Sequence, residues 1–170
     1  MIHLSEIALD NTSSIENLVH WFILKENMSQ KKVQKLCYYA QAWSVALLNK
    51  DIVEGIEFEA WVHGPVNTYI RRMLKRFGWR DIKITPEYLE NVISGVNQEF
   101  NEVQIKLLES VWETYGNLSA DELEDLTHKE QPWLEKRVGL STFESSTKKI
   151  SRKTMKKFYN SIAVSEIDLI

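Results

Sequence analysis

SQKKVQKLCYYAQAWSVALLNK, residues 29–50, is the segment of the sequence that is most informative about the fold. Its apolar side chains recur at helical spacing, and a second apolar set covers much of the remaining helix surface. The first set is Val33, Leu36, Cys37, Ala40, Trp43, Leu47 and Leu48, and the second is Tyr38, Tyr39, Ala42, Val45 and Ala46. A helix that is apolar nearly all round is buried on several sides, so we predict a central helix with the other elements packed around it.

The composition indicates a globular protein. Of the 170 residues, 44% are hydrophobic, so we expect one domain over residues 1–170 with a proper core, at about residues 12–160. We assign no structure to the leader at residues 1–11 or the tail at residues 162–170. No apolar run approaches the ~20 residues that a membrane-spanning helix needs, and no signal peptide is visible. We therefore expect a cytoplasmic protein with no membrane partner.

Further helices are predicted on both sides of the central one. Ser13 with Glu16, and Ser119 with Glu122, form capping-box patterns, and Asn67 is a further predicted N-cap. A glycine at position 95 indicates that the helix after Pro86 ends before it. The predicted helices span residues 13–25, 67–77, 85–94, 97–115, 119–130 and 150–161, with a turn or helix at 131–137 and a loop at 139–147.

One segment breaks the helical period. Apolar and polar residues alternate over residues 56–62, which is typical of a strand, and Gly64-Pro65 is expected to end it. Residues 82–84 are its predicted pairing partner. The fold class is therefore mainly α: a single-domain helical bundle around a buried central helix (29–50), with a small β-hairpin or extended element near 56–62 and 82–84.

Catalytic and metal-binding patterns are not found. The histidines and the one cysteine do not have the spacing of metal ligands, and no Gly-rich loop is present for a phosphate. Cys37 lies among apolar residues of the central helix and is interpreted as a core thiol. We predict no catalytic residue, no metal and no cofactor.

Two basic clusters remain. Arg71, Arg72, Lys75 and Arg76 share one predicted helix, and six cations, Lys148, Lys149, Arg152, Lys153, Lys156 and Lys157, lie in or beside the last one. We interpret the first cluster as a solvated helix face. For the second, a solvated face and a protein-binding face stay open, and nucleic acid is disfavoured because the net charge is −3.

Three blocks of the sequence have the order and content of a known family. They are KLCYYAQAWSVAL (35–47), FEAWVHGPV (58–66) and VWETYGNLSADELEDLTHKEQPW (111–133). The second block fits the pattern E-A-W-x-x-G-P-V, and the third fits L-T-H-x-x-x-P-W. On these blocks the chain resembles the Panacea domain family, the SocA-like antitoxins and phage-associated GepA-like proteins. The resemblance covers residues from about 30 to 158.

The resemblance implies an antitoxin of a bacterial or phage toxin–antitoxin system, which neutralises a cognate toxin by direct protein–protein binding. By analogy with SocA-like proteins it also implies a AAA+ protease as a second partner. Two alternatives stay open. One is an enzyme that reverses the toxin's modification, with a site at Thr127, His128 and the carboxylates of residues 121–125. The other is a nucleic-acid-binding regulator that uses residues 148–157.

The family motifs suggest two groups of residues. Aromatic residues in a rigid groove are typical interface anchors, although the same residues also suit a core. The candidate partner-binding residues are Tyr38, Tyr39, Trp43, Trp61, His63 and Trp133. The motif residues that we expect to be structural are Glu59, Gly64, Pro65, Val66, Thr127, His128 and Pro132.

Overall fold

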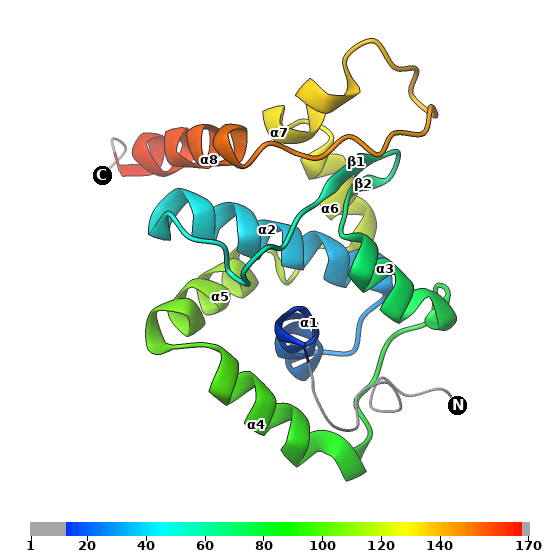
Figure 1. Cartoon of the computed structure of the whole chain (residues 1–170), viewed down its shortest axis with the longest axis vertical. Helices are drawn as coiled ribbons and strands as arrows, with labels where there is room; N and C mark the ends of the chain where they lie inside the picture. The colour runs from blue at the N-terminus through cyan, green and yellow to red at the C-terminus, as the bar shows by residue number, and fades with distance from the viewer. Residues whose placement is uncertain (1–12, 168–170) are drawn as a thin grey trace.

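The computed structural model describes the backbone of residues 13–167 and the side chains as far as Val164. The predicted leader at residues 1–11 and the end of the predicted tail lie outside the described residues. The fold is mainly helical with one small antiparallel sheet, as predicted. Figure 1 shows α2 (Gln30–Leu48) in the middle of the molecule, with α8 (Arg152–Ile167) along one side and α1 (Ser14–Lys25) on the other.

The central helix is confirmed within two residues at each end. The side chain of Ser29 accepts a hydrogen bond from the backbone N–H of Lys32, and Asn49 ends the helix in the left-handed conformation. Six other elements pack on α2: α1, α3 (Thr68–Leu74), α5 (Glu102–Tyr115), α6 (Ala120–Thr127), α8 and strand β2 (Gly64–Val66). This arrangement explains why α2 is apolar nearly all round.

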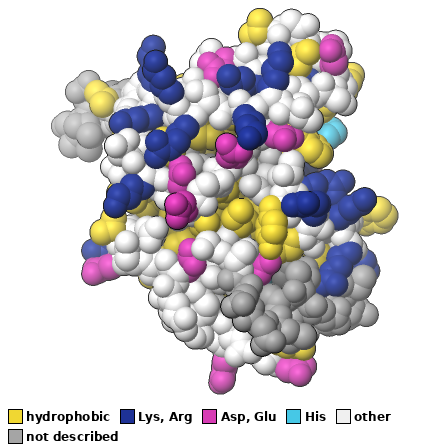
Figure 2. Space-filling model, in the orientation of Figure 1, with side chains coloured by type: hydrophobic (Ala, Val, Ile, Leu, Met, Phe, Trp, Pro, Cys, Tyr) yellow, Lys and Arg dark blue, Asp and Glu magenta, His cyan; other side chains and the backbone are white. Residues whose placement is uncertain are grey.

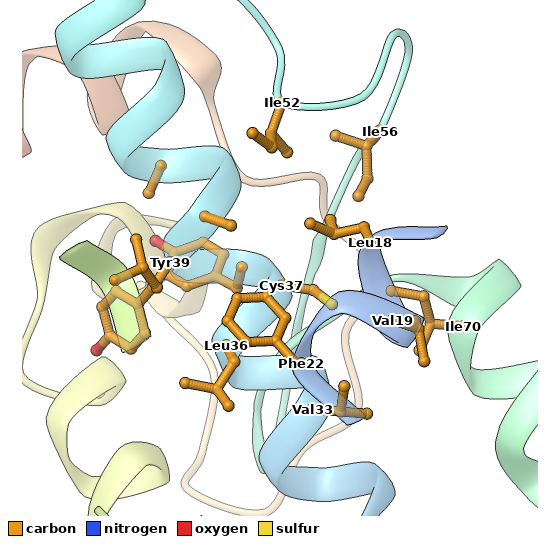
Figure 3. Close-up of a cluster of buried hydrophobic side chains, with 14 of the residues drawn as sticks. Leu18, Val19, Phe22, Val33, Leu36, Cys37, Tyr39, Ile52, Ile56 and Ile70 are labelled. Carbon is orange, nitrogen blue, oxygen red and sulfur yellow. The ribbon is translucent and has the colours of Figure 1, made fainter. Parts of the chain in front are cut away.

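The core joins α2 to α1 and to the chain that follows α2. Figure 3 shows Leu18, Val19 and Phe22 of α1 beside side chains of α2, with Ile52, Ile56 and Ile70 around them. Cys37 is buried and free, as expected of a core thiol. Leu47 departs from the predicted apolar face, because its side chain is 56% exposed near the end of the helix.

Local capping signals place several helix starts correctly. Both predicted capping boxes form, at Ser13 before α1 and at Ser119 before α6. The side chain of Asn67 caps α3, which continues into the short 3-10 helix η2 (Lys75–Phe77). The predicted turn at residues 131–137 is α7 (Gln131–Leu134) followed by η4 (Glu135–Arg137). The last helix begins two residues later than predicted and extends to Ile167.

Two helix boundaries between residues 85 and 115 were predicted wrongly. After η3 (Pro86–Tyr88), α4 (Leu89–Glu99) passes straight through Gly95. A Cβ atom at Gly95 would lie 2.8 Å from Oδ1 of Asn17, so a larger residue there would displace the buried side chain of Asn17 where α1 packs on α4. The predicted helix at 97–115 is interrupted, because Phe100 is extended and Asn101 begins α5 with its own capping box.

The strand pairing also differs from the prediction. Strand β1 (Glu59–Trp61) lies within the predicted segment, but its partner is β2, which contains Gly64 and Pro65. Gly64 has a φ of +94° and so turns the chain back on itself after Val62 and His63. Ile82 instead forms an isolated bridge with Met28. Pro65 is tolerated in β2 because it stands opposite Ala60 at a position that donates no hydrogen bond to β1.

Candidate protein-binding site

The hairpin of β1 and β2 is held on both sides by groups of the same chain. On the β1 side, the N–H of Ala60 donates to the carbonyl of Lys148 at 2.9 Å, and the N–H of Ile150 donates to the carbonyl of Phe58 at 2.8 Å. On the β2 side, Nζ of Lys35 donates to the carbonyl of Pro65 at 3.2 Å. The hairpin tip is thus presented in one fixed position.

Further along the β2 side, the side chain of Gln34 makes the pair of hydrogen bonds that a neighbouring strand would otherwise make. Nε2 of Gln34 donates to the carbonyl of Asn67 at 2.9 Å, and the N–H of Asn67 donates to Oε1 of Gln34 at 3.0 Å. Because Gln34 and Lys35 are consecutive on α2, the central helix fixes the whole outer side of β2.

The two family motifs meet at the hairpin. Nε1 of Trp133 donates to the carbonyl of Trp61 at 2.9 Å, and the ring of Trp133 stacks on that of His128 with centroids 4.0 Å apart. Burial lowers the pKa of His128. The hydroxyl of Thr127 is buried and donates to the carbonyl of Glu124 at 2.8 Å. The expected structural role of the second motif therefore has a physical basis in these contacts.

A charged cluster lies beneath the hairpin. Nζ of Lys31 is 2.6 Å from Oδ1 of Asp121 and 2.5 Å from Oε2 of Glu124, and Nδ1 of His63 is 3.0 Å from Oε1 of Glu124. Partial burial opposes ionisation of Glu124, but its contacts with Lys31 and His63 hold its pKa below the usual range. Lys35 is 1% exposed, and its burial lowers its pKa to about 7.

Two hollows open beside the hairpin tip and share Val62, His63 and Phe143. The smaller, of about 490 Å³, also borders Glu124 and His128. The larger, of about 1020 Å³, is named here the hairpin groove. Its lining comes from the start of α2, the hairpin, α3, the turn after η2 and the loop before α8. These residues are Ser29, Gln30, Lys31, Gln34, Lys35, Trp61, Val62, His63, Val66, Arg71, Gly78, Trp79, Phe143, Ser145, Ser146 and Thr147.

Two aromatic side chains of the hairpin groove are almost fully exposed. Trp79 follows Gly78 at the end of η2 and is 91% exposed, and Phe143 lies in the loop before α8 and is 83% exposed. We call this pair the aromatic rim. Large apolar side chains that are exposed beside a concave surface are typical of protein-binding sites.

The structure divides the predicted partner-binding residues. Trp61 and His63 line the hairpin groove. Tyr38 and Tyr39 have no exposed surface and lie in the core, which is the alternative that the sequence left open for them. Trp43 donates from Nε1 to the hydroxyl of Tyr115 at 2.9 Å and packs on the core, and the buried Trp133 supports Trp61 from below.

Sequence reasoning missed the aromatic rim and two of the groove's cations. Trp79 and Phe143 were not singled out, although each is the one large apolar residue in a short polar stretch, GWRD and STFESS. Lys35 was hidden within the apolar central helix. Arg71 belongs to the basic cluster that we interpreted as a solvated face, yet it lines the hairpin groove. In Figure 2 Lys and Arg side chains gather on the right, over α3.

The second basic cluster is partly engaged within the molecule. Nζ of Lys149 is 2.6 Å from Oε2 of Glu57, and Nε of Arg152 is 2.9 Å from Oδ1 of Asp51. Nζ of Lys156 donates to Oδ1 of Asn49 at 2.9 Å. These three cations link the start of α8 and the residue Lys149 before it to the end of α2 and to residues 51–57, which follow α2.

The described residues contain neither a helix that could span a membrane nor a cluster of potential metal ligands. None of their helices combines the length and the hydrophobicity needed to cross a membrane. Nor does any group of three or more His, Cys, Asp or Glu side chains in this part of the chain have the geometry of a metal site.

Comparison with known proteins identifies the family. Neither curated proteins nor solved structures give a match to the chain. The family model described as "Antitoxin SocA-like, Panacea domain" matches residues 33–134, which is more than half of the chain and includes most of α2 and all of the hairpin, α6 and α7. Membership supports a role in a toxin–antitoxin system and favours a non-enzymatic one. The chain therefore belongs to the SocA-like antitoxins of the Panacea domain family.

Proposed function

We propose that this protein neutralises a cognate toxin by binding it directly, and that the hairpin groove with its aromatic rim is the contact surface. The observation that carries the proposal is the exposure of both Trp79 and Phe143 in the lining of one groove, next to the family's hairpin. Aromatic side chains supply much of the energy of protein interfaces, and exposing them to water is unfavourable unless a partner covers them.

The fixed hairpin supports the same proposal. Its tip is held by Lys35, by Trp133 and by the chain at residues 148–150. A surface that is already ordered loses less conformational entropy when it binds, so more of the contact energy contributes to affinity. Phe143 lies beyond the matched residues 33–134, so the groove is lined both by residues of the family domain and by residues outside the matched region. We propose that this outside part contributes to the choice of toxin.

The contacts of the rival sites favour binding over the two alternatives. The hydroxyl of Thr127 is buried and already donates to a backbone carbonyl, which is unfavourable for a nucleophile. In the basic C-terminal cluster, Lys149, Arg152 and Lys156 are engaged with groups of the same chain. Fewer cations are left to neutralise phosphates, and phosphate contacts dominate nucleic-acid affinity.

We place the encounter in the cytoplasm. The one cysteine of the sequence, Cys37, is buried and free, so the fold does not depend on the oxidising conditions in which disulfides form.

The test is to express the product of the adjacent gene with and without this protein. We expect toxicity that this protein relieves, a stable complex of the two proteins, and activity of the toxin that falls in proportion to added antitoxin until the two are equimolar. Relief of toxicity at far less than one equivalent, without a complex, would contradict direct neutralisation and favour the enzyme.

Delivery to a AAA+ protease makes a different prediction from occlusion. If occlusion is sufficient, the purified complex stays inactive in the absence of any protease, and active toxin is recovered when the complex is dissociated. If delivery is required, the toxin stays active in the complex and its level falls only in cells that have the protease.

A further inference from the structure

Two cations of the hairpin groove have hydrogen-bond donors to spare. Within the described part of the chain, the ammonium of Lys35 donates one hydrogen bond, to the carbonyl of Pro65. It has three donors, and its side chain is almost fully buried. The guanidinium of Arg71 has no hydrogen bond or ion pair with a described residue, although it lines the same groove. A guanidinium is well suited to hold a carboxylate through two parallel hydrogen bonds.

The groove's own lining does not neutralise these cations. Lys31 is paired with Asp121 and Glu124, and His63 lies against Glu124. The described residues that line the groove include no aspartate and no glutamate, whereas they include two lysines and one arginine. The hollow therefore presents the positive charge of Arg71, and of Lys35 in its protonated form, beside the aromatic rim, and it is complementary to an anion that has an apolar neighbour.

We propose that the hairpin groove takes a segment of the toxin in which an aspartate, a glutamate or the C-terminal carboxylate stands next to an aromatic or aliphatic side chain. The carboxylate pairs with Arg71 and Lys35, and the apolar side chain lies between Trp79 and Phe143. This inference rests on the proposed function, because it names the part of the toxin that the proposed contact surface recognises.

The size and charge of the groove favour a peptide over nucleic acid. Its volume of about 1020 Å³ is at the upper end of the range of about 300–1,000 Å³ that small-ligand pockets have, which leaves room for several side chains. Nucleic-acid binding depends on a row of phosphate contacts, and here two groove cations have donors to spare in a protein whose net charge is −3. A single discrete carboxylate fits this arrangement better than a polyanion.

The experiment measures the binding of overlapping peptides of the adjacent gene's product to the full-length protein. We expect binding to be confined to peptides that contain a carboxylate beside an apolar side chain. Replacing that carboxylate by its amide is expected to weaken binding about 30-fold or more, as is typical for loss of one partner of a hydrogen-bonded charge pair. Arg71→Gln is expected to have the same effect, and the two changes together are expected to cost little more than either alone.

Arg72 provides the matched control. It is the next residue of α3, it is exposed, and it does not line the groove. Arg72→Gln removes the same charge from the same helix, so we expect the peptide affinity to change less than twofold. Lys35→Met tests the buried cation, and Arg71→Gln keeps the test decisive if Lys35→Met impairs folding.

The outcomes separate this inference from the proposed function. If the whole toxin binds with equal affinity to the wild type, Arg71→Gln and Arg72→Gln, the carboxylate inference is overturned and direct neutralisation stands. If the toxin forms no complex with the wild type, the proposed function fails and this inference fails with it. Displacement of the peptide by a mixed-sequence oligonucleotide at stoichiometric concentration would overturn the inference in favour of nucleic acid.

Discussion

The hydroxyl of Tyr159 donates to Oε2 of Glu130 at 2.7 Å, and this buried bond joins α8 to the N-cap of α7. Tyr39 of α2 donates to the same oxygen at 3.1 Å. One carboxylate oxygen thus connects the central helix, the second family motif and the last helix.

Tyr159→Phe tests the strength of this connection. The change removes one of two donors to a buried carboxylate, so we expect the free energy of unfolding to fall by about 1–3 kcal/mol. Urea denaturation followed by circular dichroism measures it. We also propose that the described elements form one domain, and a single transition is therefore expected. The control is Tyr88→Phe, since the hydroxyl of the half-buried Tyr88 makes no hydrogen bond to a described residue. A loss in the control as large as that in Tyr159→Phe would contradict the assignment.

The pH dependence of stability is expected to reflect two buried groups that act in opposite directions. Burial raises the pKa of Glu130 from 4.5 to about 7, so the unfolded chain loses this proton first. Protonation of Glu130 therefore adds on the order of 3 kcal/mol to the free energy of unfolding below pH 4.5. This contribution is lost as the pH rises to about 7. Burial lowers the pKa of His20 from 6.5 to about 4, so its term adds stability as the pH rises from about 4 to 6.5.

Glu130→Gln removes the pH-dependent contribution of Glu130 to stability, so the contribution of His20 can be measured without it. We expect the free energy of unfolding of this variant to rise between pH 4.5 and 6.5, because the contribution of His20 remains and the half-buried His128, whose pKa is also lowered, acts in the same direction. His20→Gln should show the reverse, a fall between pH 4.5 and 7. Denaturation curves at half-unit steps of pH measure both. Parallel profiles for the wild type and Glu130→Gln would show that Glu130 does not titrate in this range.

Gly64→Ala is expected to destabilise the hairpin strongly. An added Cβ would lie 2.6 Å from Cε of Lys35 and 2.9 Å from Oγ1 of Thr127, and the φ of +94° is itself unfavourable for alanine. We expect a loss of about 3 kcal/mol or more in the free energy of unfolding. Gly139→Ala is the control: its φ is +81° but no heavy atom lies within 4 Å of the added Cβ, so about 1–2 kcal/mol is expected. Equal losses would mean that the approach of Lys35 has no energetic consequence.

The aromatic rim is expected to contribute to binding rather than to folding. Trp79→Ala and Phe143→Ala should each weaken the complex with the toxin by about 1–2 kcal/mol or more, while the melting temperature changes little. Isothermal titration calorimetry and thermal denaturation measure the two quantities. Leu47→Ala and Val103→Ala remove exposed apolar side chains outside the groove and should leave affinity unchanged. If all four variants bind the toxin equally well, the aromatic rim is not the contact surface.

The elements that sequence reasoning located correctly are those with local signals. Ser13, Asn67 and Ser119 cap their helices through contacts with residues three positions away, so each capping motif can be recognised within four consecutive residues of the sequence. The apolar periodicity of α2 is likewise a property of one segment. The same capping pattern at Asn101 and Gln104 was present and was overlooked, which is why α5 was begun too early.

The wrong predictions concern residues whose role is set by distant parts of the chain. Gly95 does not end a helix; it lies within α4 where a Cβ would come 2.8 Å from Oδ1 of Asn17 on α1. Pro65 does not stop a strand, because its position opposite Ala60 donates no hydrogen bond to β1, while its carbonyl accepts one from Nζ of Lys35 on the outer side of β2. Sequence spacing does not reveal either neighbour, since each lies on another element.

Dependence on distant contacts also explains which residues of the hairpin groove could be predicted from the sequence and which could not. The family resemblance directed attention to Trp61 and His63, which line the hairpin groove, and to Tyr38 and Tyr39, which lie in the core. Exposure of an aromatic residue depends on what packs over it, so the isolated positions of Trp79 and Phe143 carried only a weak signal. Their place on one groove follows from the packing of α3 and the loop before α8 around α2.

The enclosed hairpin determines how another protein can recognise this one. Many proteins bind a peptide by adding it as a further strand to an exposed sheet edge, where the main chain supplies most of the affinity and side chains matter less. Here residues 148–150 occupy the edge of β1, and Gln34 and Lys35 occupy the edge of β2. Strand addition is therefore blocked on both sides, as is the edge-to-edge aggregation that open edges promote. On the proposed function, a toxin that docks at this hairpin is recognised through its side chains, so we expect single substitutions in either protein to change which toxin is accepted.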